Sequence, residues 1–234
     1  MLTLAKKLSD LALDIFFPKT CLCCGEVGVF LCLPCQVSLQ PAIQSCIYCQ
    51  KPSLFGFTHP VCKSSQSPEA MYSIWNYHHP PVARMIGTAK YRFLPESFEI
   101  YGKLLGQSLI ENFGTAFFKE FTLSSIPLHT TRLRWRGFNQ SAVIAQSCAQ
   151  VLQIPYQELL HRTKNTTPQI KLSKEKRKEN MSQVFSLIPN PPAIPKKLLL
   201  IDDVVTTGST LLEATRILKK SGVTYIVCVT LARD

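Results

Sequence analysis

The chain has 234 residues, and 46% of them are hydrophobic, a share that permits a buried core and excludes wholesale disorder. It carries 26 Lys and Arg against 15 Asp and Glu, which gives a formal net charge of +11. Charged residues make up 18% of the chain, below the roughly 25% of an average globular protein, so the positive charge reflects few acids rather than many bases. A basic surface suits phosphate-rich partners such as nucleic acid, nucleotides or an anionic membrane.

The first predicted element is a short amphipathic helix within residues 1–17, where apolar residues recur at helical spacing before Pro18. We expect it to dock onto the protein's own core. Contact with a membrane or a partner is the alternative, which the lack of a broad basic face disfavours. Apolar runs here fall short of the roughly 7–15 residues of a signal-peptide core, and elsewhere of the roughly 18–20 of a membrane span. We therefore expect a cytoplasmic protein without a membrane span.

Residues 18–66 contain eight of the ten cysteines. Six of the eight form three Cys-x2-Cys pairs, and a fourth pair joins a histidine to a cysteine at the same spacing. Two intervening residues let a turn present both ligand atoms to one tetrahedral ion, and two such turns complete its coordination. In a reducing cytosol, clustered cysteines are more typical of metal ligands than of disulfides. The pattern predicts a double zinc-ribbon-like domain with two structural sites, formed by Cys21, Cys24, Cys32 and Cys35 and by Cys46, Cys49, His59 and Cys62.

Three alternatives to this assignment stay open. Cys23 adjoins Cys24, and either thiol can be the second ligand of the first site, although the spacing favours Cys24. His59 can be an ordinary loop histidine and Cys62 a free thiol, which would leave one zinc per chain. Four thiolates can also hold an iron–sulfur cluster.

Residues 67–234 have the pattern of an α/β domain. We predict helices over residues 97–113, 139–152 (capped by Asn139) and 209–221, strands over 122–128, 197–201 and 223–231, and at most one short strand near 184–187. The last strand–helix–strand unit implies a parallel sheet flanked by helices. Cys148 and Cys228 lie in apolar stretches and are expected to be buried.

The most informative motif is LLLIDDVVTTGST, residues 198–210. A buried strand ends in two carboxylates, and a hydroxyl-rich loop with one glycine then opens the next helix. Ligands of parallel α/β sheets bind beyond the carboxyl ends of the strands, and backbone amides at a helix start bind anions. The acids suit the hydroxyls of a sugar, with Mg²⁺ bridging what remains. The motif predicts a ribose 5-phosphate site formed by Asp202, Asp203, Thr206, Thr207, Gly208, Ser209 and Thr210. The alternative is an acidic turn that binds nothing.

The motif resembles the phosphoribosyl pyrophosphate (PRPP) motif of type I phosphoribosyltransferases. Together with the cysteine pairs, Lys90-Tyr91, RLRWRGFNQ (132–140) and RTKNTTPQIKLSKEKRKEN (162–180), it makes the chain resemble the ComF family of competence-protein-F-like proteins over residues 18–231. The resemblance implies a zinc-ribbon part followed by a type I phosphoribosyltransferase-like domain over residues 67–234. It also implies PRPP with Mg²⁺ and a mobile loop over residues 162–180. His59 departs from the family, which more often has cysteine there.

Basic side chains in these segments are candidates for contacts with pyrophosphate or DNA: Lys90, Arg132, Arg134, Arg136, Arg162, Lys164 and Arg177. Cations near a departing pyrophosphate would stabilise its charge. Arginines interleaved with Trp135 and Phe138 could instead hold single-stranded DNA by stacking and charge. In a third interpretation the aromatics pack in the core and the cations are solvated.

Three functions remain open at this stage. By its family resemblance the chain is a PRPP-binding protein that assists the uptake and handling of single-stranded DNA in natural transformation or DNA utilisation. Such a protein has single-stranded DNA, and other DNA-uptake or recombination proteins, as expected partners. The second function is an active phosphoribosyltransferase with an unidentified acceptor. The third is an adaptor whose zinc ribbons bind proteins while the PRPP site senses nucleotide supply.

Overall fold

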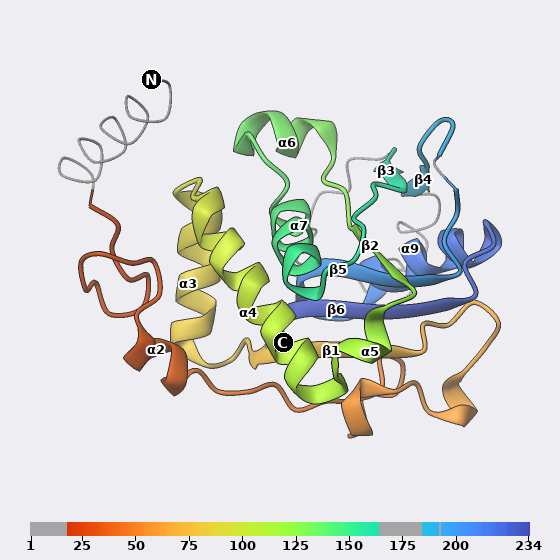
Figure 1. Ribbon diagram of the computed structural model, residues 1–234, viewed down its shortest axis with the longest axis horizontal. Coiled ribbons are helices and arrows are strands. Elements are labelled where there is room, and N and C mark those ends of the chain that lie inside the picture. Colours follow the sequence, from red (N-terminus) through yellow and green to blue (C-terminus); the bar gives the residue numbers. More distant parts are fainter. Residues whose placement is uncertain (1–17, 164–183, 192) are drawn as a thin grey trace, which may run out of the picture.

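The computed structural model describes residues 18–163, 184–191 and 193–234 (Figure 1). The helix predicted within residues 1–17 and the candidate cations Lys164 and Arg177 lie outside these ranges.

Four parallel strands form the central sheet, in the order β1-β6-β5-β2. They are β1 (Ala70–Asn76), β2 (Phe121–Ser125), β5 (Lys197–Val205) and β6 (Tyr225–Arg233). Helix α9 (Ser209–Lys220) joins β5 to β6, so the predicted strand–helix–strand unit and the parallel α/β fold are confirmed. Strand β5 runs four residues beyond the predicted end because Val204 and Val205 pair with Ala232 and Arg233 of β6. The two aspartates therefore lie inside a paired strand.

Helices cover the two faces of the sheet. On one face lie α3 (Pro80–Tyr91), α4 (Pro95–Phe113) and α7 (Gln140–Leu152), and α9 covers the other (Figure 1). Strand β5 alternates accordingly, with Leu199 and Ile201 buried toward the first face and Leu198 and Leu200 toward α9. Helices α4 and α7 pack closely at Gly102, where a Cβ atom would lie only 2.5 Å from the carbonyl oxygen of Ile144.

The remaining elements are short. They are α2 (Leu33–Ser38), α5 (Thr115–Phe118), α6 (Thr130–Arg136), the 3-10 turns η1 (Leu54–Gly56) and η2 (Pro60–Cys62), and an antiparallel pair formed by β3 (Leu160–Arg162) and β4 (Phe185–Leu187). The predicted helices over 97–113 and 139–152 are confirmed, and the Asn139 side chain caps α7 by accepting from the Ser141 amide at 3.2 Å. The strand predicted over 122–128 ends at Ser125.

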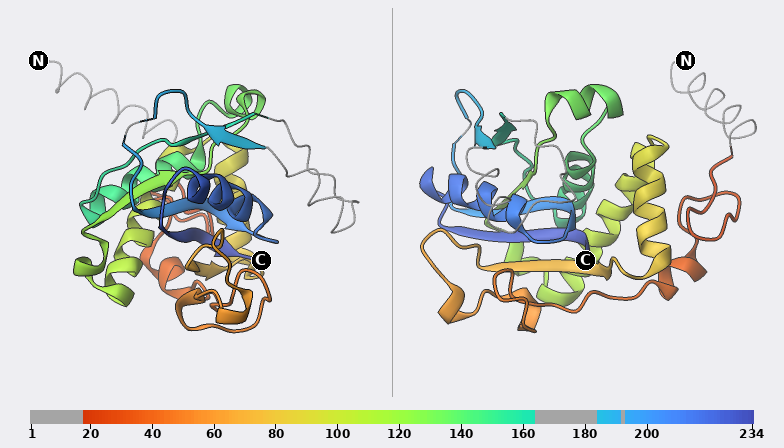
Figure 2. Two further views of the ribbon diagram at one scale, coloured as in Figure 1. Left: turned by 90° about the vertical axis from the view of Figure 1, so that its right-hand side faces the viewer. Right: turned by 180° about the vertical axis from the view of Figure 1, so that it is seen from behind.

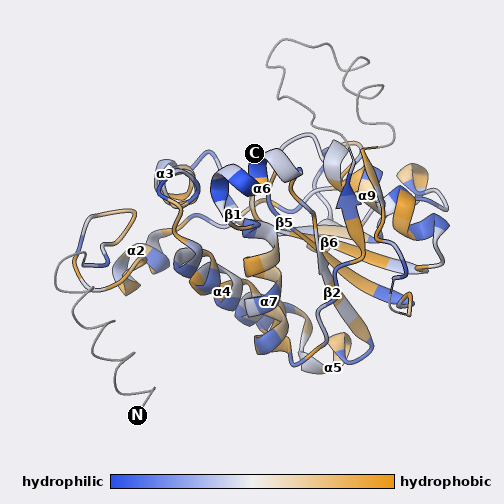
Figure 3. Cartoon of the chain, turned by 90° about the horizontal axis from the view of Figure 1, so that it is seen from above, coloured by the Kyte–Doolittle hydropathy of each residue, from blue (hydrophilic) through white to orange (hydrophobic). Residues whose placement is uncertain are grey.

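The cysteine-rich segment packs onto the sheet and its helices. Leu22, Phe30 and Leu31 are buried in the same cluster as α3 and α4, whereas Ile47 is buried in the cluster under α9. Hydrophobic residues, orange in Figure 3, gather in β5 and β6. The boundary between residues 66 and 67 stays a prediction. None of the helices in the described ranges combines the length and the apolarity that a membrane span requires.

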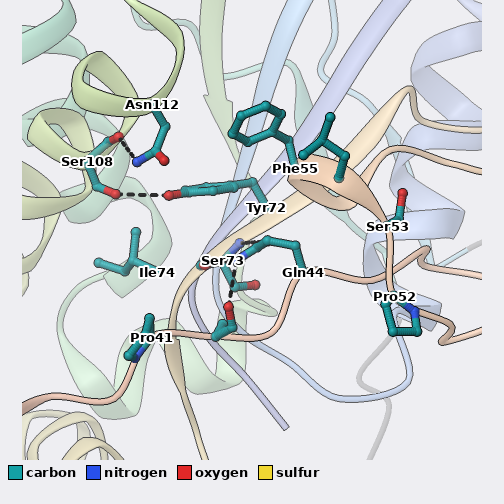
Figure 4. Close-up of a pocket in the computed structure, with 12 residues that line it drawn as sticks. Pro41, Gln44, Pro52, Ser53, Phe55, Tyr72, Ser73, Ile74, Ser108 and Asn112 are labelled. Atoms are coloured by element: carbon teal, nitrogen blue, oxygen red, sulfur yellow. Dashed lines mark hydrogen bonds between the residues drawn. The ribbon is translucent and has the colours of Figure 1, made fainter.

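A cavity of about 690 Å³ lies between residues 41–55, β1 and α4 (Figure 4). At its floor the Gln44 side chain pairs with both backbone groups of Ser73, donating to the carbonyl at 2.7 Å and accepting from the amide at 3.2 Å. Gln44 thus satisfies the hydrogen-bonding groups of the Ser73 backbone on the outer edge of β1. The side chains that line this cavity include neither aspartate of the acidic motif, so the two features are separate.

Candidate functional site

Asp203 lies near the carboxyl end of β5 and is only 6% exposed. Its Oδ2 atom is 2.7 Å from the ammonium of Lys90, at the end of α3, and accepts a hydrogen bond from Gln140 Nε2 of α7 at 2.8 Å. Its Oδ1 atom accepts from the Val204 amide. A buried carboxylate needs such partners, and here two helices supply them. The structure thus pairs Lys90 with Asp203, and its predicted contact with pyrophosphate or DNA stays a prediction.

Asp202 is half-buried, and its Oδ1 atom accepts from Ser141 Oγ and from the Asp203 amide, both at 2.9 Å. Burial and the neighbouring charge of Asp203 raise the pKa of Asp202 to about 7, against the opposing effects of Ser141, the Asp203 amide and Lys90. Within the described part of the chain, these hydrogen bonds leave Oδ2 of Asp202 available. A sugar hydroxyl or a cation could bind that oxygen.

We expect Asp202→Asn to flatten the pH dependence of stability between pH 5.5 and 8. The raised pKa means that the folded state holds this proton to higher pH than the unfolded chain, whose group titrates near 3.8. The free energy of unfolding of the wild type should therefore fall as pH rises toward 7, by roughly 1–2 kcal/mol from this group. Guanidinium denaturation across the range measures the slope. Equal slopes in the two proteins would contradict a raised pKa.

The motif RGFNQ connects α6 to the acidic pair. Gly137 adopts the left-handed conformation that ends α6, with φ at 80°, and Asn139 starts α7. Gln140 then bridges two groups, because its Oε1 accepts from Arg136 Nη1 at 2.6 Å while its amide donates to Asp203. The sequence did not single out Gln140 or Ser141. Their signal was a pair of polar residues at the start of an otherwise apolar helix.

Arg136 is a half-buried cation beside this network. Burial lowers its pKa, and the charge of Asp203 opposes the shift. Its Nε atom is buried and finds no hydrogen-bond partner among the residues that the structure describes. An anion placed between Arg136 and the acidic pair would supply one.

Arg162, at the end of β3, stands on the Asp202 side of the site. Burial lowers its pKa, as does the nearby charge of Arg132, while Asp202 acts in the opposite direction. Its guanidinium also lies 5.6 Å from the ring centre of Phe185. The structure therefore brings Lys90, Arg132, Arg136 and Arg162 around the two aspartates, whereas Arg134 is exposed on α6.

The hydroxyl-rich loop follows Val205 directly. Gly208 is buried and left-handed, with φ at 75°, and it is the N-cap residue of α9. Because a glycine has no side chain, Gly208 itself cannot cap the first turn of α9, and the Ser209 amide makes only a long hydrogen bond of 3.5 Å to Thr207 Oγ1. An anion could replace that long bond at the start of the helix. Thr206 and Thr207 are exposed, and the Thr207 hydroxyl lies 2.9 Å from that of Ser209. The loop thus presents hydroxyls and amides next to the acidic pair.

An exposed aromatic patch flanks the site, formed by Tyr91, Phe93 and Trp135. Phe93 and Trp135 meet edge to face with ring centres 5.0 Å apart, and Trp135 is 57% exposed. Phe138 instead packs inward, 6.0 Å from Phe98. Of the two aromatic residues in RLRWRGFNQ, Trp135 is therefore on the surface and Phe138 packs against the core.

The cysteines gather into two groups with the predicted membership, Cys21, Cys24, Cys32 and Cys35 and Cys46, Cys49, His59 and Cys62. In each group the four ligand atoms lie within 4.8 Å of one another. The Sγ atoms of Cys24 and Cys32 are 3.6 Å apart, close to the roughly 3.8 Å between thiolates around tetrahedral zinc. Both groups can therefore hold a structural zinc ion.

The adjacent thiols Cys23 and Cys24 give a matched test of the first group. Cys23 lies outside it, with its Sγ 4.0 Å from the sulfur of Met85. We expect Cys24→Ala to lower the bound zinc by one ion per chain and Cys23→Ala to leave it unchanged, as measured by elemental analysis of the purified proteins. Loss of zinc in Cys23→Ala alone would reverse the assignment.

Residues 139–234 match the model of the phosphoribosyl transferase domain family. With the parallel sheet and the acidic strand end, this match defines a phosphoribosyltransferase-type domain.

Similarity to curated proteins narrows the class of phosphoribosyltransferase-type proteins to which the chain is related. The chain is 38% identical to competence protein F of Haemophilus influenzae over 110 residues, which cover 46% of this chain and 48% of that protein. It is 28% identical to the DNA utilization protein YhgH of Salmonella typhimurium over 200 residues, 82% of this chain and 85% of that one. Competence protein ComFC of Streptococcus pneumoniae is 30% identical over 117 residues, half of each chain. The chain is thus a homologue of the ComF and YhgH proteins, and the predicted resemblance is confirmed. The matches span about half the length of the two competence proteins.

Proposed function

We propose that the chain binds PRPP together with Mg²⁺ at the carboxyl end of β5. The observation that carries this proposal is the junction of Asp202 and Asp203 with the hydroxyl-rich loop that opens α9. Loop amides and hydroxyls hold the 5-phosphate, and the acidic pair holds the ribose hydroxyls. Oδ2 of Asp202, which accepts no hydrogen bond from the described residues, is the atom that we assign to the metal ion.

The surrounding cations complete the proposed site. The charge of Asp203 acts on Arg136 and that of Asp202 acts on Arg162, while Arg132 acts on both arginines. Three arginines and Lys90 beside two carboxylates give the site an excess of basic side chains. Such a site suits a pyrophosphate group, which a ribose 5-phosphate lacks. The arrangement therefore favours PRPP over the simpler sugar phosphate.

Calorimetry with the wild-type chain tests this proposal. PRPP should bind saturably with Mg²⁺ present and much more weakly with the metal chelated, and ribose 5-phosphate should bind more weakly than PRPP. Heats that do not saturate with PRPP and Mg²⁺ would overturn the proposal.

We further propose that the protein handles single-stranded DNA during DNA uptake or utilisation. The names of its relatives, competence proteins and DNA utilization proteins, support this role. So does the aromatic patch, because exposed rings among cations can stack successive bases while the cations hold the backbone. Other DNA-uptake or recombination proteins remain predicted partners.

Trp135→Ala is expected to weaken binding of single-stranded DNA by roughly 5- to 150-fold, since stacking of one base on an aromatic ring contributes about 1–3 kcal/mol. Phe117→Ala is the control, because this ring is also partly exposed but lies on α5, outside the patch. Fluorescence anisotropy with a labelled oligonucleotide gives both affinities. Repeating it at several salt concentrations separates the phosphate contacts, which should weaken steeply with salt. Equal affinities for the two variants would rule out the aromatic patch.

A further inference from the structure

The second cysteine cluster, Cys46, Cys49, His59 and Cys62, adjoins the loop that precedes α9. Ile47, which follows its first ligand, is 2% exposed and belongs to the buried cluster that contains Val205 and Leu211. A Cβ atom on Gly208 would lie 2.8 Å from Cγ1 and 3.1 Å from Cδ1 of Ile47. The Ile47 side chain therefore presses directly on the backbone at the start of α9.

A second contact fixes the same turn. Arg233, the last residue of β6, is 7% exposed and donates to the Ser45 carbonyl and to Gln50 Oε1, both at 2.7 Å. Its neighbour Asp234 donates a backbone hydrogen bond to the Val205 carbonyl. The turn Cys46–Cys49 is thus attached to the strand ends on which the loop rests. Figure 2, left, shows this orange segment beside the C-terminus.

The first cysteine cluster docks elsewhere. Leu22, which follows Cys21 as Ile47 follows Cys46, is buried in the cluster of α3 and α4. The Cys23 carbonyl accepts from Arg84 of α3 at 3.2 Å. The two clusters have similar ligand sets but support different parts of the fold.

We propose that Ile47 is a positioning residue for the phosphate loop, through which the second cysteine cluster is coupled to PRPP binding. This inference rests on the proposed function. A metal ion bound by the second cysteine cluster would fix the conformation of the turn that contains Ile47. The Ile47 side chain then restricts the Gly208 backbone to the conformation that exposes the first amides of α9. Removing the buried side chain leaves a space into which the loop can relax.

Coupling between two sites is reciprocal. If the occupied cluster favours PRPP binding, bound PRPP must favour zinc retention by the same factor. The effect should be confined to one of the two zinc ions, because the first cluster does not adjoin the loop.

Three variants separate positioning from general packing: Ile47→Ala, the milder Ile47→Val, and the matched control Leu22→Ala. PRPP affinity is measured by calorimetry, and zinc affinity is measured by equilibrium competition with a chromogenic chelator, with and without saturating PRPP. We expect Ile47→Ala to weaken PRPP binding by about five- to 150-fold, the usual range of site-to-site coupling. Ile47→Val should weaken it less, and Leu22→Ala should leave it unchanged. PRPP should raise the affinity for one zinc ion in the wild type but not in Ile47→Ala.

The inference is overturned if the wild type binds PRPP and Ile47→Ala binds it equally well, or if PRPP changes the affinity for neither zinc ion. If Ile47→Ala does not fold, Ile47→Val carries the comparison. If the wild type does not bind PRPP, the proposed function fails, and amide exchange at residues 206–211 decides the positioning role alone. Faster exchange in Ile47→Ala than in Leu22→Ala supports it, and equal exchange contradicts it.

Discussion

PRPP binding in the presence of Mg²⁺ is expected to fall at least about 100-fold when Asp202 and Asp203 are both replaced by Asn, since each change removes a charged hydrogen-bond partner contributing roughly 1.5–3 kcal/mol. An asparagine keeps the shape of the side chain, but its neutral carbonyl oxygen attracts a divalent cation less strongly than a carboxylate does, and its nitrogen cannot accept from a hydroxyl. Calorimetry on the variant and the wild type measures the difference.

Asp234→Asn is the control for this experiment. Asp234 follows β6 at the same carboxyl end of the parallel strands, and its carboxylate lies 3.4 Å from His78. The Asp234→Asn variant should therefore bind PRPP with the affinity of the wild type. Full affinity in the Asp202/Asp203 double variant would place the ligand elsewhere.

Lys90→Met is expected to lower the free energy of unfolding by roughly 2–4 kcal/mol, because it leaves a buried carboxylate without its counter-charge. The Lys90 side chain is 21% exposed and that of Asp203 is 9% exposed, so solvent screens the pair only in part. Adding Asp203→Asn should restore much of the loss, since the charge is then gone. Chemical denaturation of the two single variants and the double variant measures the coupling.

Lys197→Met provides the comparison. Its ammonium pairs with Glu120 at 2.5 Å, but the two side chains are 41% and 74% exposed. Such a pair contributes roughly 0–1 kcal/mol. A similar loss in Lys90→Met and Lys197→Met would mean that burial does not decide the strength of the Lys90–Asp203 pair.

The successful predictions rest on sequence patterns within short segments of the chain. The apolar run of β5, the Asn139 cap and the cysteine spacing each depend on residues close together in sequence. The sequence of α3 contains the same kind of signal, although no helix is predicted there. Its buried residues follow helical spacing after Pro80 and Pro81: Val82, Met85, Ile86 and Ala89. β1, buried along most of its length, was also missed.

What the sequence could not supply are contacts between distant segments. Gln140 binds Asp203, which is 63 residues later in the sequence, and the sequence around neither residue predicts this contact. Strand β5 continues past Ile201 because its last residues pair with β6. The sequence of β5 alone does not contain that information. The contact of Ile47 with Gly208 likewise depends on how two separately recognised motifs pack.

The edge strands of the sheet bear on how this protein can associate with others. Beyond β1, residues 40–44 bond to the strand, with the Ala42 amide donating to Ile74 and the Gln44 side chain covering Ser73. At the opposite edge, Leu123 of β2 donates to the Pro155 carbonyl and accepts from the Gln157 amide. An incoming strand would have to displace these bonds before it could add to the sheet. These contacts therefore disfavour association by extension of the central sheet, and they leave the side chains on its helices and loops as the surface that a partner or a second copy would contact.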